Sequence, residues 1–313
     1  RKIGFRFRPR FDVRHPDLLR YVALTLPLML GLTMTFSTEV FSKFFGSYLP
    51  VGGISWIEYA MRIMLMMVAF FGQAAGVASF PFMARLAAEN RIGEMNRLLN
   101  DTLRYLALVM PVSVLLMVLR HEVVAVLYQR GHFLPADTLM TARLLPFLLV
   151  GSVAFAVQTV VNRGFYATQN TLFPALYGTA AVLASIPVYI LGLRTMGLAG
   201  VALAISVSAM IQVLALYVMW NRRFPAPERF QVYRFYLKVA VMSLPLGMVL
   251  EVIRRGVVRV FHPAGLAGDL ATVACLGGCF LGLLLAVARL WKIDEVFHIL
   301  GRIRSRLPGW GGG

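Results

Sequence analysis

Charged side chains inside apolar stretches are the residues of this sequence best placed to do chemistry. Glu39 lies four residues before Lys43, and Glu58 lies four residues before Arg62. A charge at the centre of a bilayer costs at least ~2.5 kcal/mol, so it usually faces a polar cavity or a partner. A guanidinium such as that of Arg62 either extends to lipid headgroups or faces a water-filled cavity. In a cavity it can form paired hydrogen bonds with phosphate.

The Glu39–Lys43 pair and a further charged residue, Arg143, also have simpler explanations. Glu39 and Lys43 are one helical turn apart, so they can neutralise each other near a membrane surface. Arg143 opens an apolar stretch, where its side chain can reach back to the headgroups. These explanations remain open beside a binding role.

The sequence contains no recognisable catalytic signature. It has no phosphate-cradling glycine loop, no paired histidines at metal-binding spacing and no serine nucleophile motif. The five histidines are scattered over connections and ends, at His15, His121, His132, His262 and His298. We therefore expect neither an enzyme nor a metal site, and no cofactor.

The composition indicates a membrane protein. Apolar residues make up 59% of the chain and charged residues only 14%, whereas soluble domains average about 25% charged residues. The net charge of +17 would raise nucleic acid as a partner of a soluble protein, but no nucleic-acid motif is present. The basic residues lie mainly between the apolar stretches, where they can meet anionic membrane lipids.

The elements that must position the charged residues are transmembrane helices. A span needs ~20 apolar residues, because every backbone polar group must be paired internally in hydrocarbon. We predict an all-α, polytopic membrane protein with about eight spans, at residues 21–46, 55–80, 105–119, 138–161, 172–193, 197–220, 235–253 and 266–288.

The predicted organisation has five parts. They are a cytoplasmic juxtamembrane arm at 1–20, a six-helix lobe at 21–221 with an amphipathic interfacial helix at 82–104, a cytoplasmic linker at 222–234, a final helix pair at 235–290, and a basic cytoplasmic tail at 291–313.

The distribution of positive charge predicts the orientation. If residue 1 is cytoplasmic and the spans alternate, most of the 31 Lys and Arg residues fall inside, as the positive-inside rule requires. The exceptions are Lys43, Arg62, Arg120, Arg130, Arg143, Arg194, Arg254, Arg255 and Arg259. Both ends of the chain are therefore expected in the cytoplasm.

Prolines inside the spans indicate a bundle that bends. They are Pro27, Pro111, Pro146, Pro187 and Pro245. Each removes one backbone hydrogen bond and tends to kink its helix, a feature common in transporters.

Five sequence segments, in order and at the expected intervals, resemble the MurJ (MviN) family of lipid II flippases, in the multidrug/oligosaccharidyl-lipid/polysaccharide exporter superfamily. They are SWIEYAMRIM, SFPFMARLAAE, LYQRGHFLPADT, NRGFYATQNTLFP and MGLAGVALAISVSA. The resemblance implies fourteen helices in two lobes around a central cavity. This chain would supply the seventh to the fourteenth helix and lack the first lobe.

The resemblance also implies site residues. Arg62 matches the family's cavity arginine on the eighth helix, which makes Arg62, Glu58, Lys43 and Glu39 the candidate substrate-binding residues. The cargo would be a polyprenyl-pyrophosphate-linked saccharide. Where many members carry Val-Asp-Arg on the seventh helix, this sequence has Phe41, Ser42 and Lys43.

The last two helices of the family form a groove for the polyprenyl tail. The candidates here are Leu244, Met248, Leu276 and Phe280, which lie mid-span, and Gly278, which leaves room beside them. An ordinary lipid-facing surface explains the same residues equally well.

The resulting hypothesis is a protein of the bacterial inner membrane that flips lipid II by alternating access. Its partners would be membrane lipids and the lipid-linked saccharide. Two alternatives remain: an exporter of O-antigen lipid, other polysaccharide lipid or drugs, and a non-transporting scaffold for cell-wall enzymes.

Overall fold

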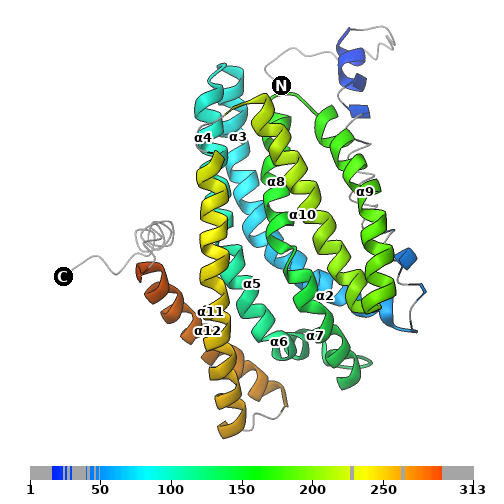
Figure 1. The fold of residues 1–313 in the computed structure, drawn as a ribbon, viewed down its shortest axis with the longest axis vertical. Helices are drawn as coiled ribbons and strands as arrows, with labels where there is room; N and C mark the ends of the chain where they lie inside the picture. The colour runs from blue at the N-terminus through cyan, green and yellow to red at the C-terminus, as the bar shows by residue number, and fades with distance from the viewer. Residues whose placement is uncertain are drawn as a thin grey trace, which may run out of the picture.

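The computed structural model describes residues 16–23, 25–26, 29, 40, 43–45, 47–48, 50–225, 229–261 and 265–290. Every regular element in these residues is a helix (Figure 1). The labelled elements are α2 (Gly53–Val68), a π-helical turn (Ala69–Gln73), α3 (Ala74–Ala88), α4 (Ile92–Leu106), α5 (Val109–Val118), α6 (Arg120–Tyr128), α7 (Pro135–Leu149), α8 (Ser152–Ala167), α9 (Leu172–Met196), α10 (Leu198–Arg223), α11 (Arg229–Phe261) and α12 (Gly265–Leu290).

The helices run up and down as a bundle, which confirms the predicted fold class. Six described segments are long and apolar enough to cross a membrane, and the bent pair of α7 and α8 makes a seventh. The remaining predicted span, at 21–46, falls largely outside the described residues, as do most of the predicted arm at 1–20 and the whole tail at 291–313.

The second predicted span is a single rod made of α2, the π turn and α3. The rod packs closely on α8 because Gly72 has no side chain. A Cβ at this position would lie 2.8 Å from the Cα of Ala156. A π turn carries one extra residue and leaves its carbonyls poorly paired. The Gln73 carbonyl accepts a hydrogen bond of 3.1 Å from Nη1 of Arg163 on α8.

The prediction of one interfacial helix over 82–104 is wrong. The structure has a reverse turn at residues 89–91, with Asn90 in the left-handed region (φ 56°). Arg85 and Arg91 both pair with Glu89 in this turn, and their hydrogen bonds lower the pKa of the Glu89 carboxyl. The segment is therefore a helical hairpin, α3 and α4, at one end of the bundle (Figure 1).

The amphipathic pattern of α4 has a different cause from the one predicted. Its inward face carries two buried amides that bind α10: Asn96 accepts from Trp220 Nε1 at 2.8 Å, and Asn100 accepts from the Tyr217 hydroxyl at 2.9 Å. The apolar face of α4 thus packs on neighbouring helices rather than on lipid, and Ile92–Val118 forms one candidate span.

The span predicted at 138–161 is bent by 48° between α7 and α8. In a straight helix the Phe147 carbonyl would accept from the N–H of Gly151. At the bend that N–H donates to the Leu148 carbonyl at 3.0 Å, and the Phe147 carbonyl loses its helical partner. Instead Ser206 of α10 donates its hydroxyl to the Phe147 carbonyl at 2.6 Å and accepts from the Gly151 N–H at 3.1 Å. One serine therefore repairs the break on both sides.

The final two helices are longer than predicted, and the linker is shorter. α10 ends at Arg223 and α11 begins at Arg229, so most of the predicted 222–234 linker is helical. α11 packs along α5, and α12 packs on α6 and α11. Their shared core is separate from the main core and is made by Val118, Leu119, Leu246, Leu250, Leu276 and Phe280.

The closest helix pair, α9 and α10, depends on two facing glycines. A Cβ on Gly200 would overlap the carbonyl of Gly192, whereas one on Gly282 in α12 would meet nothing within 4 Å.

We expect Gly200→Ala to separate the two helices and to lower the free energy of unfolding by about 1–3 kcal/mol. Gly282→Ala should leave the thermal unfolding midpoint in detergent unchanged or raise it. Equal midpoints for both variants would contradict this packing.

Candidate functional site

The predicted cluster of charged residues lies at the start of α2. Lys43 Nζ lies 3.8 Å from Glu58 Oε1, with both side chains well exposed. In the described part of the chain Glu58 thus pairs with Lys43 rather than with Arg62. Glu39, the predicted partner of Lys43, lies outside the described residues. Glu58 and Arg62 lie on successive turns of α2, and Lys43 reaches Glu58 from the segment that precedes the helix.

Arg62 is exposed and rests on aromatic side chains. Its guanidinium lies 5.7 Å from the ring centroid of Tyr59, a cation–π contact. Tyr59 packs in turn on Tyr128 and Phe133, at 4.8 and 5.0 Å between ring centroids. The aromatic residues restrict where the guanidinium can lie, and its hydrogen-bond donors remain open to a ligand.

Tyr128 supplies a further polar group near Arg62. Its hydroxyl is buried and has no hydrogen-bond partner among the described residues. Burial raises the pKa of this hydroxyl, and the positive charge of Arg62 offsets part of the rise. The hydroxyl therefore stays protonated at neutral pH.

A hydrogen bond attaches the start of α2 to α7. Trp56 donates its indole N–H to Asp137 Oδ1 at 2.8 Å, while Asp137 Oδ2 accepts from the backbone N–H of Leu134 at 2.9 Å. Asp137 thus holds both its own helix start and the helix that carries Arg62. These residues lie in two of the segments that resembled the family.

A second arginine, the half-buried Arg163 of α8, contacts the α2–α3 rod, and sequence reasoning missed its role. Arg163 was assigned only to the cytoplasmic charge count, but it bridges α8 to the π turn, donating to the carbonyl of Gln73 and, at 2.8 Å, to Gln73 Oε1. A signal was present: Gln73 is the one polar residue between Arg62 and Ser79.

An exposed stripe runs along the α2–α3 rod from Arg62 to Gln73. Arg62 lies at one end, and Arg163 of α8 is bound to Gln73 at the other. Between Arg62 and Gln73 the exposed residues include Met66 and Phe70, at 58% and 74% exposure. At 1.5 Å per residue the cations lie about 16 Å apart along the rod. The stripe combines apolar area with a fixed positive charge at each end, an arrangement that suits a ligand with both anionic and apolar parts.

The structure does not bring the five predicted groove residues together. Leu276 and Phe280 are 0% and 4% exposed, because they pack in the core that joins α12 to α5 and α11. Leu244 and Met248 are exposed on α11, at 62% and 68%, and Leu244 borders the space between α11 and α10. Gly278 faces open space. Leu276 and Phe280 are packing residues, and the groove assignment fails for them.

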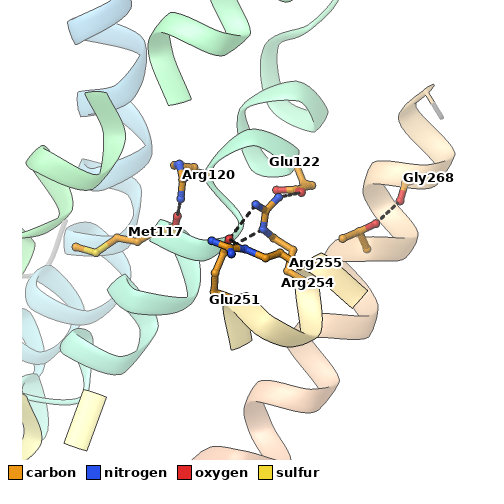
Figure 2. Close-up of polar contacts among 8 residues, drawn as sticks. Met117, Arg120, Glu122, Glu251, Arg254, Arg255 and Gly268 are labelled. Carbon is orange, nitrogen blue, oxygen red and sulfur yellow. Dashed lines mark hydrogen bonds and ion pairs between the residues drawn. The ribbon is translucent and has the colours of Figure 1, made fainter. Parts of the chain in front are cut away.

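A network of ion pairs joins the last helices to the lobe (Figure 2). Arg254 of α11 donates to Glu122 of α6 at 2.8 Å and to Glu251 at 3.1 Å, and Glu251 also accepts from Arg255 at 2.9 Å. The Glu122 side chain is only 6% exposed. A buried carboxylate requires a partner, so Arg254 determines whether α6 and α11 can stay in contact.

Removing Arg254 should be far more harmful than removing its neighbour Arg255. Arg254→Met leaves Glu122 buried and unpaired, which costs about 3–5 kcal/mol. Arg255 is 67% exposed and pairs with the same Glu251, so Arg255→Met should cost about 1 kcal/mol or less. Denaturant unfolding in detergent measures both. The double variant Glu122→Gln, Arg254→Met should recover part of the loss, and a failure to recover any would contradict the unpaired-charge explanation.

Comparison with known proteins decides the family. The family model described as "Lipid II flippase MurJ" matches residues 1–268. The chain belongs to the MurJ family. It is 27% identical over 217 residues to a probable lipid II flippase MurJ of Vibrio cholerae, covering 69% of this chain and 41% of that protein. It is 28% identical over 249 residues to one of Rhizobium tropici, covering 79% and 46%.

The chain spans about half the length of the MurJ relatives it matches. Its fold resembles a solved structure of lipid II flippase MurJ in an inward closed conformation, with a TM-score of 0.68 and 22% identity over 90% of this chain and 57% of that one. It also resembles an outward-facing multidrug resistance transporter of the MATE family, with a TM-score of 0.54 and 16% identity over 93% and 71%. The chain is a multi-pass membrane protein whose fold matches part of each of these transporters.

Proposed function

We propose that this chain is part of a lipid II flippase of the bacterial inner membrane, which moves a polyprenyl-pyrophosphate-linked peptidoglycan precursor across the bilayer by alternating access. Membership of the MurJ family supports the transport class, and the relatives are named as flippases of lipid II. Flipping makes and breaks no covalent bond, which agrees with a sequence that has no catalytic signature.

The observation that carries the proposal is the exposed guanidinium of Arg62 on a membrane helix. An exposed arginine inside a membrane span is costly unless it faces water or an anion. Its planar donors match phosphate oxygens, and its position over Tyr59 limits its freedom before the ligand arrives. In the proposed mechanism Arg62 binds the pyrophosphate, with Lys43 and Glu58 beside it.

The exposed stripe from Arg62 to Gln73 is the surface that, on this proposal, faces the cargo and a second lobe. Relatives about twice as long have room for such a lobe. A lobe opposite the stripe would shield Met66 and Phe70 from water and leave the arginines as the polar groups of the cavity. Arg163 would then be the second cation available to the cargo.

The proposed role of Arg62 predicts a large functional effect. Loss of hydrogen bonds to a charged group removes about 1.5–3 kcal/mol, or roughly 10- to 100-fold in affinity. Arg62→Ala in the full-length protein should abolish growth of a flippase-depleted strain, and Arg62→Lys should restore it partly, because an ammonium offers a point charge without the fork. Membrane levels are measured by immunoblot.

The matched control is Arg130→Ala, an exposed arginine at the same end of the bundle, which should support normal growth. Normal growth of Arg62→Ala would assign Arg62 to the headgroup region and remove the cavity role. Reconstituted wild-type protein should transport lipid II, and Arg62→Ala protein should not. Drug transport should be absent from both proteins or the same in both, which separates a flippase from a drug exporter.

We further propose that both ends of the chain are cytoplasmic. The α3–α4 turn and the junction of α10 and α11 lie at one end of the bundle, and the α6–α7 and α11–α12 connections at the other (Figure 1). The predicted alternation of spans assigns 22 of the 31 Lys and Arg residues to the first end and nine to the other. Those at the first end include Arg85, Arg91, Arg97, Arg104, Arg222, Arg223, Arg234 and Lys238. The positive-inside rule therefore favours placing it in the cytoplasm.

Cysteine labelling tests this orientation. In a background with Cys275→Ala and Cys279→Ala, an impermeant maleimide added to the periplasmic side should label Gly256→Cys and His132→Cys but not Gly93→Cys. Gly256 and Gly93 have open space around a new side chain, and His132 is exposed, so accessibility depends on the side of the membrane. The reverse pattern of labelling would overturn the orientation.

A further inference from the structure

A large apolar cavity separates α10 from α11. Its volume is about 520 Å³, and its lining includes Met210 of α10, Val157 of α8, Val114 of α5 and Leu244 of α11. The lining residues of α8 lie on a different face of that helix from Arg163. The cavity is therefore distinct from the stripe proposed to bind the cargo, and it belongs to the boundary between the six-helix lobe and the final pair.

The cavity is suited to hydrocarbon and not to water. Its two serine hydroxyls are satisfied by their own helices: Ser113 donates to the Val109 carbonyl and Ser243 to the Val239 carbonyl, each at 2.7 Å. Water enters a cavity when it finds two to four polar partners. With the remaining lining apolar apart from tyrosines at one end, an alkyl chain is the occupant that the surface can bind.

The length of the cavity matches one leaflet of a bilayer. Along α11 its lining extends from Val232 to Leu244, which is about 18 Å at 1.5 Å per residue. Half of a hydrocarbon core of ~30 Å is about 15 Å. The cavity thus begins near one membrane surface and ends near the midplane, as the acyl chain of a phospholipid does.

The end of the cavity near the membrane surface is aromatic and basic. Tyr217 donates to Asn100, Tyr236 donates to the Leu103 carbonyl at 2.7 Å, and the rings of Tyr217 and Tyr233 pack edge to face, 5.5 Å apart. Tyrosines gather where hydrocarbon meets headgroups. Arg104 follows Leu103, which lines the cavity. Its guanidinium donates to Gln231 of α11 and lies 3.9 Å from the exposed carboxylate of Asp101, a loose pair that leaves donors for a phosphate.

We propose that this cavity binds one anionic phospholipid of the surrounding bilayer, with an acyl chain between α10 and α11 and its phosphate at Arg104. Charge complementarity at the mouth and the one-leaflet length both fit this occupant. A polyprenyl chain, which is much longer than an acyl chain, would exceed the cavity at the midplane. The lipid would fill the boundary between α10 and α11 and so couple the final pair to the lobe.

Filling the cavity tests the acyl-chain site. Full-length protein is purified in mild detergent, and retained lipid is identified by native mass spectrometry. We expect the wild type to retain one phosphatidylglycerol and to unfold several degrees higher when that lipid is added. Ala240→Phe and Leu214→Trp, which fill the cavity from α11 and α10, should lose both the adduct and the shift.

The matched controls are Val241→Phe and Ile211→Trp, neighbouring positions on the same helices that do not line the cavity. They should keep the adduct and the shift. Without added lipid, the filled variants should unfold no lower than the controls, which shows that they fold. Retention of lipid by both filled variants, or no retained phospholipid in the wild type, would overturn the proposal.

The headgroup is tested by Arg104→Gln, with Arg97→Gln as its control on the same helix. Arg104→Gln should bind phosphatidylglycerol and phosphatidylcholine equally, while the wild type and Arg97→Gln prefer the anionic lipid about tenfold or more. If Arg104→Gln still prefers phosphatidylglycerol to phosphatidylcholine, the lipid phosphate does not bind at Arg104. If polyprenyl phosphate, and not phosphatidylglycerol, gives the adduct and the shift, the occupant is the cargo's tail and the proposal is wrong.

Discussion

Every break in a membrane helix exposes backbone groups that have no water to bind, and this constraint explains the polar residues inside the bundle. Hydrocarbon leaves an unpaired carbonyl costly. At two breaks the structure supplies a side chain from a neighbouring helix: Arg163 reaches the carbonyl of Gln73 in the π turn, and Ser206 bonds both sides of the bend between α7 and α8. These repairs join α8 to the α2–α3 rod and α10 to the bent pair.

The same repairs give the breaks a use. A π turn and a bend are the positions where a helix can change direction with little loss of hydrogen bonding. Both lie on or near α8, which is in contact with the rod that carries Arg62. In a transporter that alternates between two states, helices jointed at these points can move the exposed stripe while the packed core stays intact.

The final helix pair is attached by means that differ from one end to the other. At one end, Glu122 and Arg254 form a buried ion pair between α6 and α11. At the other, the tyrosines of α10 and α11 pack together near Arg104. Between them lie the small core of α5, α11 and α12 and the cavity. A pair fixed at both ends around a lipid-sized cavity combines stability with a boundary open to the membrane.

The sequence by itself determined the class of protein and the course of the chain. Long apolar stretches require lipid as solvent, because only internally paired helices survive there. The ends of the stretches located α9, α10 and α12 to within a few residues, whereas α11 extends six residues further at its start and eight at its end. Charge inside the stretches made Arg62 a candidate for the same reason. These features depend on local composition, which the sequence contains in full.

Only the tertiary structure decided how those helices use their surfaces. The amphipathic pattern of α4 has the same period whether the helix packs on lipid or on Trp220 and Tyr217 of α10, so the sequence could not distinguish the two. Apolar residues at 244 and 276 are alike in composition, yet one borders a cavity and the other fills a core. The partners of Gln73 and Phe147 lie on helices far along the chain, and proximity of that kind exists only after the bundle has folded.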